Sequence, residues 1–184
     1  MKKRAAIELS IGTIVIIVLA MTMLIMGLVL IKTIFSGARY NVDTINDKVK
    51  EQINKMFSED DSNPIITYLA NNKATVKRGN EFGVAIGIKN LDSGNQASKF
   101  KYEVKLGEDS SELKKQCGIT EKEAMELILK GKTDEFTIRP GDYSYGLIRI
   151  VTEKESPICM IRYRIELYKN GQPYASTFFD LEIK

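Results

Sequence analysis

The longest apolar stretch of the chain runs from Ile11 to Ile31 and contains no charged residue. Its only polar side chains are those of Thr13 and Thr22, whose hydroxyl groups can bond back to the backbone of a helix. Because a helix rises about 1.5 Å per residue, a helix of this length can cross the roughly 30 Å hydrocarbon core of a bilayer. The pattern therefore predicts a transmembrane helix over residues 11–35, with the lipid bilayer as its partner.

Two other interpretations of this stretch are less favoured. A removable signal peptide has an apolar region of about 7–15 residues before a small-residue cleavage site. Here the apolar region is longer, and Lys32 follows it without such a site. A buried helix of a globular domain seldom stays apolar on every face for this long. Because Lys2, Lys3 and Arg4 precede the stretch, residues 1–10 are predicted to be cytoplasmic and the C-terminal part extracytoplasmic.

The next pattern has the spacing of an amphipathic helix. Apolar residues recur at intervals of three and four, at Val42, Ile45, Val49, Ile53 and Met56, with polar residues between them. The pattern ends in the polar run from Ser58 to Pro64. We expect residues 36–63 to form an amphipathic stalk helix and a linker that continue from the membrane helix.

After residue 64 the period of the pattern changes to two, which is typical of strands. Further short strands are expected at 65–69, 74–77, 100–105, 135–139, 145–151, 158–168 and 174–183, the last two joined by an Asn-Gly hairpin turn. A capping box at Thr120 and Glu123 begins one inserted helix. Residues 64–184 are therefore predicted to form an antiparallel, immunoglobulin-like β-sandwich, which makes the whole chain a membrane-anchored α+β protein.

One strand of this region has an unusual second face. Phe82, Val84, Ile86 and Ile88 alternate with the small residues Gly83, Ala85 and Gly87. Small side chains allow a neighbouring element to approach the strand closely. Two partners are open at this stage: a helix, with the one at 42–56 as the candidate, or the opposite sheet of the sandwich.

Composition and charge exclude several classes of function. The net charge is +3, and residues 1–35 account for all of it, so the remainder is neutral and gives no reason to expect nucleic acid as a partner. The chain has no histidine, which excludes histidine-based catalysis and histidine metal sites. No catalytic, cofactor-binding or metal-binding residues are predicted, and the chain is not expected to be an enzyme. A serine–lysine pair formed in space stays open, because sequence does not reveal it.

The two cysteines, Cys117 and Cys159, are predicted to form a disulfide bond. Cys159 begins a row of residues that faces the core, and Cys117 precedes the inserted helix, so a bond would tie the insertion to the sheet. A pair of free, buried thiols is the alternative. Two cysteines without histidine are too few ligands for a zinc site unless carboxylates join them.

The residues before the apolar stretch carry a more specific signal. Lys3, Arg4, Ala5 and Ala6 precede it, and Ile11-Gly12-Thr13-Ile14-Val15 opens it. This arrangement resembles the class III signal of archaeal type IV pilins and archaellins. The resemblance implies cleavage between Ala5 and Ala6, with the apolar helix retained; an uncleaved basic flank is the alternative.

Glu8 is the residue that the resemblance makes a candidate for assembly. Type IV pilins often carry a glutamate at the fifth mature position, where it can neutralise the terminal amine of a neighbour. After the implied cut Glu8 would be the third mature residue, so it departs from that register. The alternative role of Glu8 is a carboxylate in the first helical turn, where the helix dipole favours it.

These features together predict a structural or adhesive protein at the cell surface. In its most specific form the chain is a pilin-like filament subunit, which forms a homo-oligomer as the apolar helices pack into a filament core. A lone anchored domain that binds other surface proteins belongs to the same class. The alternative from a different class is an accessory subunit of an envelope enzyme or transporter complex.

Overall fold

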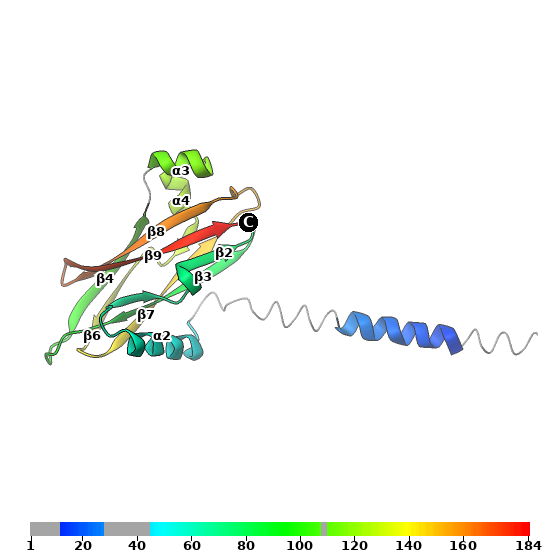
Figure 1. Cartoon of the computed structure of the whole chain (residues 1–184), viewed down its shortest axis with the longest axis horizontal. Helices are drawn as coiled ribbons and strands as arrows, with labels where there is room; N and C mark the ends of the chain where they lie inside the picture. Colours follow the sequence, from blue (N-terminus) through cyan, green and yellow to red (C-terminus); the bar gives the residue numbers. More distant parts are fainter. Residues whose placement is uncertain (1–11, 28–44, 108–109) are drawn as a thin grey trace, which may run out of the picture. The chain divides into compact units, whose positions relative to one another are not determined.

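A computed structural model of the chain describes residues 12–27, 45–107 and 110–184. The chain divides into two units, residues Met1–Tyr40 and Asn41–Lys184, and each is described by itself (Figure 1). The first unit contributes one helix over residues 12–27. The second unit contains all of the strands that are described below.

Within the predicted membrane segment at 11–35, the structure describes residues 12–27, and these form a helix. Within residues 12–27, 45–107 and 110–184, no helix is long and apolar enough to cross a membrane. The predictions of a single-pass membrane anchor and of a location across the cell membrane are therefore wrong.

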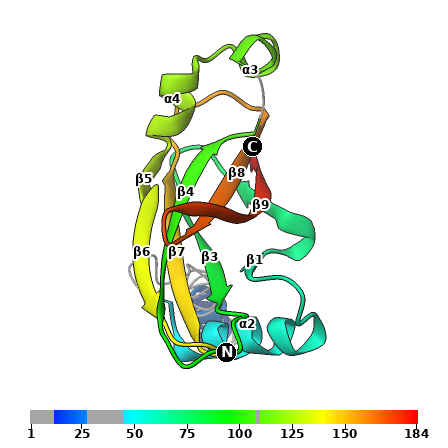
Figure 2. The ribbon, with the colours of Figure 1, turned by 90° about the vertical axis from the view of Figure 1, so that its left-hand side faces the viewer.

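The second unit is built on two packed β-sheets (Figure 2). The four-stranded sheet has the order β1 (Ile65–Thr67), β3 (Glu81–Lys89), β7 (Tyr143–Val151), β5 (Ile128–Lys130). The five-stranded sheet has the order β2 (Lys73–Val76), β9 (Gln172–Ile183), β8 (Met160–Lys169), β4 (Ser98–Leu106), β6 (Thr133–Ile138). A hydrophobic core lies between the two sheets. Its fully buried residues include Ile86, Ile148, Tyr102 and Ile165. The prediction that this part of the chain forms a β-sandwich is confirmed.

One strand pair departs from the antiparallel arrangement that the sequence predicts. β2 runs parallel to β9, with Lys73 opposite Asp180 and Val76 opposite Ile183. The chain reaches this position from β1 through the short 3-10 helix η1 (Ala70–Asn72), so it changes sheets between two strands. Alternation along a strand indicates which face is buried but not the direction of its neighbour, which is why the sequence did not reveal the parallel pair.

The hairpin formed by β8 and β9 has the predicted turn. Asn170 and Gly171 both have positive φ values, 50° and 82°, as a type I′ turn requires. The register places Tyr163 opposite Phe179 and Ile165 opposite Thr177. A bulge interrupts it between Leu167 and Tyr168, close to the turn.

Helix α2 (Asp47–Glu59) covers the outer face of the four-stranded sheet. Its apolar side buries Val49, Ile53 and Phe57 in a second core with Ala85 of β3. Asn46 caps the helix by accepting a hydrogen bond from the Val49 amide at 2.9 Å. This helix is part of the sandwich unit, so the amphipathic segment does not form the stalk that the sequence suggests.

The small residues of β3 explain how close the helix lies. A Cβ atom added to Gly87 would clash with Cγ2 of Ile53 and would lie 2.8 Å from Cε2 of Phe57. Polar contacts fix the helix further, because the Tyr145 hydroxyl donates to Oδ1 of Asn54 at 2.6 Å. The first of the two open alternatives, a helix over this face, is therefore confirmed at Ala85 and Gly87. Gly83 instead faces Leu147 of the neighbouring strand.

We expect Gly87→Ala to lower the free energy of unfolding by about 1–3 kcal/mol, because a methyl group there forces α2 away from the sheet. Gly94→Ala is the matched control, since a Cβ atom at Gly94 meets nothing within 4 Å. Chemical denaturation of both variants measures the difference. Equal midpoints for Gly87→Ala and Gly94→Ala would contradict the close approach of the helix.

Candidate functional site

The predicted processing and assembly residues, Arg4, Ala5, Ala6 and Glu8, lie outside the described residues. Their roles therefore stay predictions. Two regions of the chain that the sequence singled out are described: the apolar helix at 12–27, and the insertion that carries Cys117.

The helix at 12–27 exposes apolar side chains in every direction. Its large apolar residues are exposed by 50% at Ile17 to 77% at Met26, and they comprise Ile14, Val15, Ile16, Ile17, Val18, Leu19, Met21, Met23, Leu24, Ile25 and Met26. Successive residues of a helix point about 100° apart, so this run surrounds the axis completely. The Thr22 hydroxyl donates to the Leu19 carbonyl at 2.8 Å, which satisfies it within the helix.

Such a helix has no polar face for water to solvate. Burial of a large apolar side chain is favourable by about 1.5–3 kcal/mol, and short isolated helices are marginal in water. The helix at 12–27 is therefore stabilised by any apolar surface that covers it. Residues 12–27 contain no charged side chain, so the chemistry of this helix suits association with apolar surfaces.

The insertion between β4 and β5 consists of two helices, α3 (Ser110–Cys117) and α4 (Glu121–Glu126), where the sequence predicts one. Both lie at one end of the sandwich (Figures 1 and 2). The predicted capping box begins α4: the Thr120 amide donates to Oε2 of Glu123 at 2.7 Å, and the Glu123 amide donates to the Thr120 hydroxyl. The Thr120 amide and hydroxyl both donate to the Glu123 carboxylate, and these two hydrogen bonds lower the pKa of Glu123.

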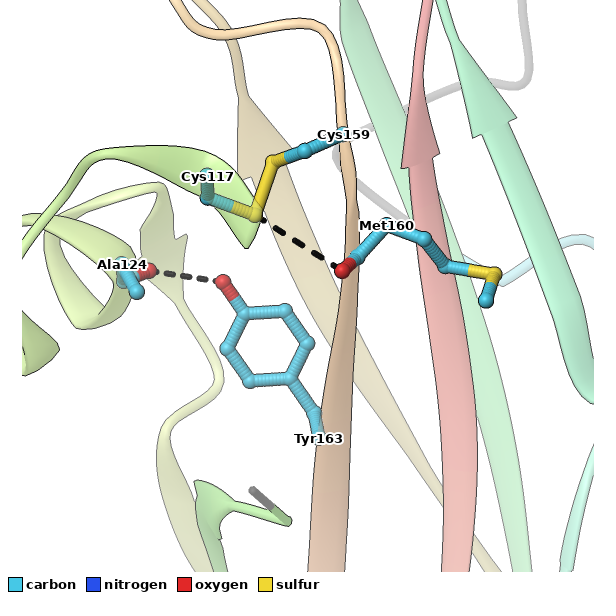
Figure 3. Close-up of a disulfide and its surroundings, with 5 residues drawn as sticks. All are labelled: Cys117, Ala124, Cys159, Met160 and Tyr163. Carbon is cyan, nitrogen blue, oxygen red and sulfur yellow. Dashed lines mark hydrogen bonds between the residues drawn. A yellow bond between two sulfur atoms is a disulfide. The ribbon is translucent and has the colours of Figure 1, made fainter. Parts of the chain in front are cut away.

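A disulfide bond joins Cys117 at the end of α3 to Cys159 just before β8 (Figure 3). The Cα atoms are 5.4 Å apart, and the predicted pairing is confirmed. Sγ of Cys117 also lies 3.7 Å from the Met160 carbonyl oxygen. This is a van der Waals contact and not a hydrogen bond, because a disulfide sulfur has no proton to donate. With 42 residues of sequence separation, the chain-entropy model gives the bond about 4 kcal/mol of stabilisation.

A second tie holds the insertion, and the sequence gives no sign of it. The Tyr163 hydroxyl of β8 donates to the Ala124 carbonyl of α4 at 2.7 Å (Figure 3). Burial raises the pKa of Tyr163, so the phenol stays protonated and donates. Leu113 of α3 and Ala124 are both fully buried in the main core. The two helices are thus an integral cap on the sandwich.

The outer face of the five-stranded sheet carries charged side chains in matched pairs. Arg162 donates to both carboxylate oxygens of Asp180, at 2.7 and 2.8 Å. Lys105 donates to Glu166, and this hydrogen bond lowers the pKa of Glu166 while it raises that of Lys105. Such pairs neutralise one another, so these groups do not form an activated acid or base.

A groove of about 670 Å³ lies on the same face, beside the hairpin turn. Its lining comprises Lys99, Phe100, Lys101, Glu103, Glu135, Phe136, Thr137, Tyr168, Asn170 and Gly171. Two lysines and two glutamates give it no preference for either sign of charge. Lys101 pairs with Glu103 at 2.7 Å, and the Tyr168 hydroxyl donates to Glu166, so three of its polar groups already have partners.

The part of the chain that the structure describes contains no group of side chains that could ligate a metal ion. No three histidine, cysteine, aspartate or glutamate side chains there lie close enough to hold an ion. The acidic run after α2 forms its own turn, because Asp60 accepts hydrogen bonds from the Ser62 hydroxyl and amide. These hydrogen bonds lower the pKa of the Asp60 carboxyl group.

Comparison with known proteins adds no functional assignment. No family model matches the chain, and no curated protein matches it. The resemblance to pilins and archaellins therefore gains no support from either comparison.

Similar solved structures share only a distant likeness. An alkylpurine DNA glycosylase from Pseudomonas fluorescens has 11% identity and a TM-score of 0.34, over 65% of this chain and 30% of that one. A β-glucosidase from Listeria innocua has 12% identity and a TM-score of 0.35, over 65% and 16%. A Niemann-Pick type C2 protein from the Japanese carpenter ant has 14% identity and a TM-score of 0.35, over 65% and 89%. This chain thus spans less than a third of the first two, and scores this low carry no inference about its function.

The two buried tyrosines of the core offer a matched test of the cap. We expect Tyr163→Phe to lower the free energy of unfolding by about 1–2 kcal/mol, because the Ala124 carbonyl loses its donor. The Tyr102 hydroxyl is buried and has no partner among the described protein groups. Tyr102→Phe should therefore leave stability unchanged or raise it by up to about 1 kcal/mol. Chemical denaturation of both variants measures the difference. An equal loss of unfolding free energy in both would contradict the role given to the Tyr163 hydrogen bond.

Proposed function

We propose that this chain is a non-catalytic structural subunit that assembles with copies of itself through the apolar helix at 12–27. In this assembly the helices bury the apolar side chains of one another. The observation that carries the proposal is the exposure of apolar side chains all around the helix.

The choice of partner follows from the shape of the apolar surface. A helix that is apolar on all sides is stable inside a cluster, whereas a groove on another protein covers one side of it. Other copies of the same helix supply apolar surfaces of equal length. Van der Waals packing and the removal of apolar area from water then favour the assembly.

The sandwich unit supports the proposal because it needs no further helix. Both of its core clusters are made of residues between Ile45 and Ile183, and α2 already covers the outer face of the four-stranded sheet. The disulfide and the Tyr163 hydrogen bond close one end of it. Its 22 basic and 23 acidic residues nearly balance, which suits a domain that does not repel its neighbours.

A non-catalytic role is consistent with the side chains that the unit offers. The sequence has no histidine, and the carboxylates of Asp180, Glu103 and Glu166 each lie in an ion pair. Hydrogen bonds from Lys101 and Lys105 lower the pKa of Glu103 and of Glu166, respectively, which keeps these two carboxylates in their charged form.

We expect the full chain to sediment as an oligomer at micromolar concentration and Leu24→Lys to dissociate it. A lysine in the cluster of helices would bury an unpaired charge, which weakens association by about 100-fold, or roughly 3 kcal/mol. Leu129→Lys is the matched control, because Leu129 lies on β5 and is 63% exposed, close to the 65% of Leu24.

Analytical ultracentrifugation of the three proteins gives the result. Dissociation by Leu24→Lys alone supports the proposal. A wild-type chain that is monomeric, or two lysine variants that sediment alike, would overturn it.

A further inference from the structure

With the disulfide formed, both helices of the cap lie on the sandwich, but α4 also has ties of its own. Its Ala124 is fully buried, and the Ala124 carbonyl accepts the hydrogen bond from the Tyr163 hydroxyl of β8. At the C-terminal end of α4, the Leu127 carbonyl accepts a hydrogen bond from the Val151 amide of β7 at 2.8 Å. α4 is therefore bonded to a strand of each sheet, independently of the disulfide.

Helix α3 depends on fewer contacts than α4. Within residues 111–117 the side chains of Leu113 and Cys117 are buried, and the others are exposed. α3 packs against β8, and its Leu113 belongs to the main core. Among the described residues, no hydrogen bond or ion pair joins 111–117 to either sheet. One leucine side chain and the disulfide therefore hold α3 in place.

Without the covalent bond, α3 has little to keep it ordered. It has 8 residues, and isolated helices shorter than about 12–15 residues are marginal in water. Burial of Leu113 alone opposes the conformational entropy that the whole segment gains when it leaves the sandwich. Gly118, which joins α3 to α4, has a φ value of 69°, and a Cβ atom there would meet nothing within 4 Å. The link between the two helices is thus free of packing that would hold α3 against α4.

We propose that the bond between Cys117 and Cys159 is a redox-sensitive switch that controls α3 alone. When the disulfide is formed, α3 is docked on β8. When the disulfide is reduced, α3 leaves the sandwich and unfolds, while α4 and both sheets stay folded. The thiol–disulfide state of the surroundings then determines whether Leu113 and Cys117 are buried or exposed. The helix at 12–27 has no part in this switch, so the switch does not rest on the proposed assembly.

A dithiol can reduce the bond through its accessible sulfur. Cys159 is partly exposed and lies between the exposed residues Ile158 and Met160, whereas Cys117 is buried (Figure 3). One thiolate of the dithiol attacks Sγ of Cys159, forms a mixed disulfide with it and expels Cys117 as a thiolate, which takes up a proton. The second thiolate of the dithiol then closes a disulfide within the reductant, and Cys159 leaves and is protonated in turn. The two cysteines gain two electrons and two protons, and the dithiol loses them.

Amide hydrogen exchange of the full chain, before and after complete reduction with dithiothreitol, tests the switch. The amides to follow are those of residues 114–118, because they bond to carbonyls one turn earlier in α3, as the Gly118 amide does to Lys114. We expect them to exchange at least about tenfold faster after reduction, because α3 then opens locally. Amides of α4 and β8 should keep their slow exchange.

Two results of this measurement would overturn the proposal. Unchanged exchange at 114–118 in the fully reduced chain would show that α3 stays docked without the bond. Equal loss of protection in α3, α4 and β8 would show that the whole domain unfolds. Tyr163→Phe with the disulfide intact is the matched control, because it removes a tie of α4 and should leave 114–118 protected. Acceleration at 114–118 in this variant, as large as that caused by reduction, would also contradict a switch that acts on α3 alone.

Alkylation of the reduced chain under native conditions gives a second measurement. A docked α3 keeps the Cys117 thiol buried and slow to react, whereas a released α3 exposes it to the reagent. We expect Cys117 and Cys159 to be alkylated in the same ratio of rates as in the chain unfolded by denaturant. Alkylation of Cys117 that is about tenfold slower than this ratio predicts would show that α3 remains docked after reduction, and would overturn the proposal.

Discussion

The contact between α2 and β3 determines how the rest of the sandwich unit is built. A strand with large residues on one face and small residues on the other can bury both, provided that something lies close against the small face. Ala85 and Gly87 leave room for Ile53 and Phe57 of α2, and the helix fills that space. The four-stranded sheet is thus covered by the other sheet on one face and by a helix on the opposite one.

This arrangement makes the sandwich unit self-sufficient. Its main core lies between the sheets, its second core lies under α2, and its end is closed by α3 and α4 through the disulfide and the Tyr163 hydroxyl. Residues between Ile45 and Ile183 make up both cores, and the apolar helix at 12–27 belongs to the other unit. The driving force for burying that helix is therefore available for association, which links the architecture of the chain to the role that we propose for it.

Local patterns predicted the local features well. Three of these features depend on residues that are neighbours in the sequence: the alternation in β3, the Asn170-Gly171 turn and the capping box at Thr120. The disulfide was predictable for another reason, because Cys117 and Cys159 are the only two cysteines and have one possible pairing. The parallel pairing of β2, the second inserted helix and the Tyr163–Ala124 hydrogen bond depend on distant segments, and periodicity does not report them. The predicted membrane segment was wrong, because no helix of the described residues is long and apolar enough to cross a membrane. Of the candidate site residues, the two cysteines are brought together, whereas the processing residues lie outside the described part of the chain.

The most direct test of the account is amide hydrogen exchange of the full chain at a series of protein concentrations. If copies of the chain bury the helix, protection of residues 12–27 should rise with concentration, because association stabilises the helix by mass action. Amides of β3 and β8 should exchange at the same rates throughout, since the sandwich holds its own core. Exchange at residues 12–27 that is independent of concentration would contradict the account.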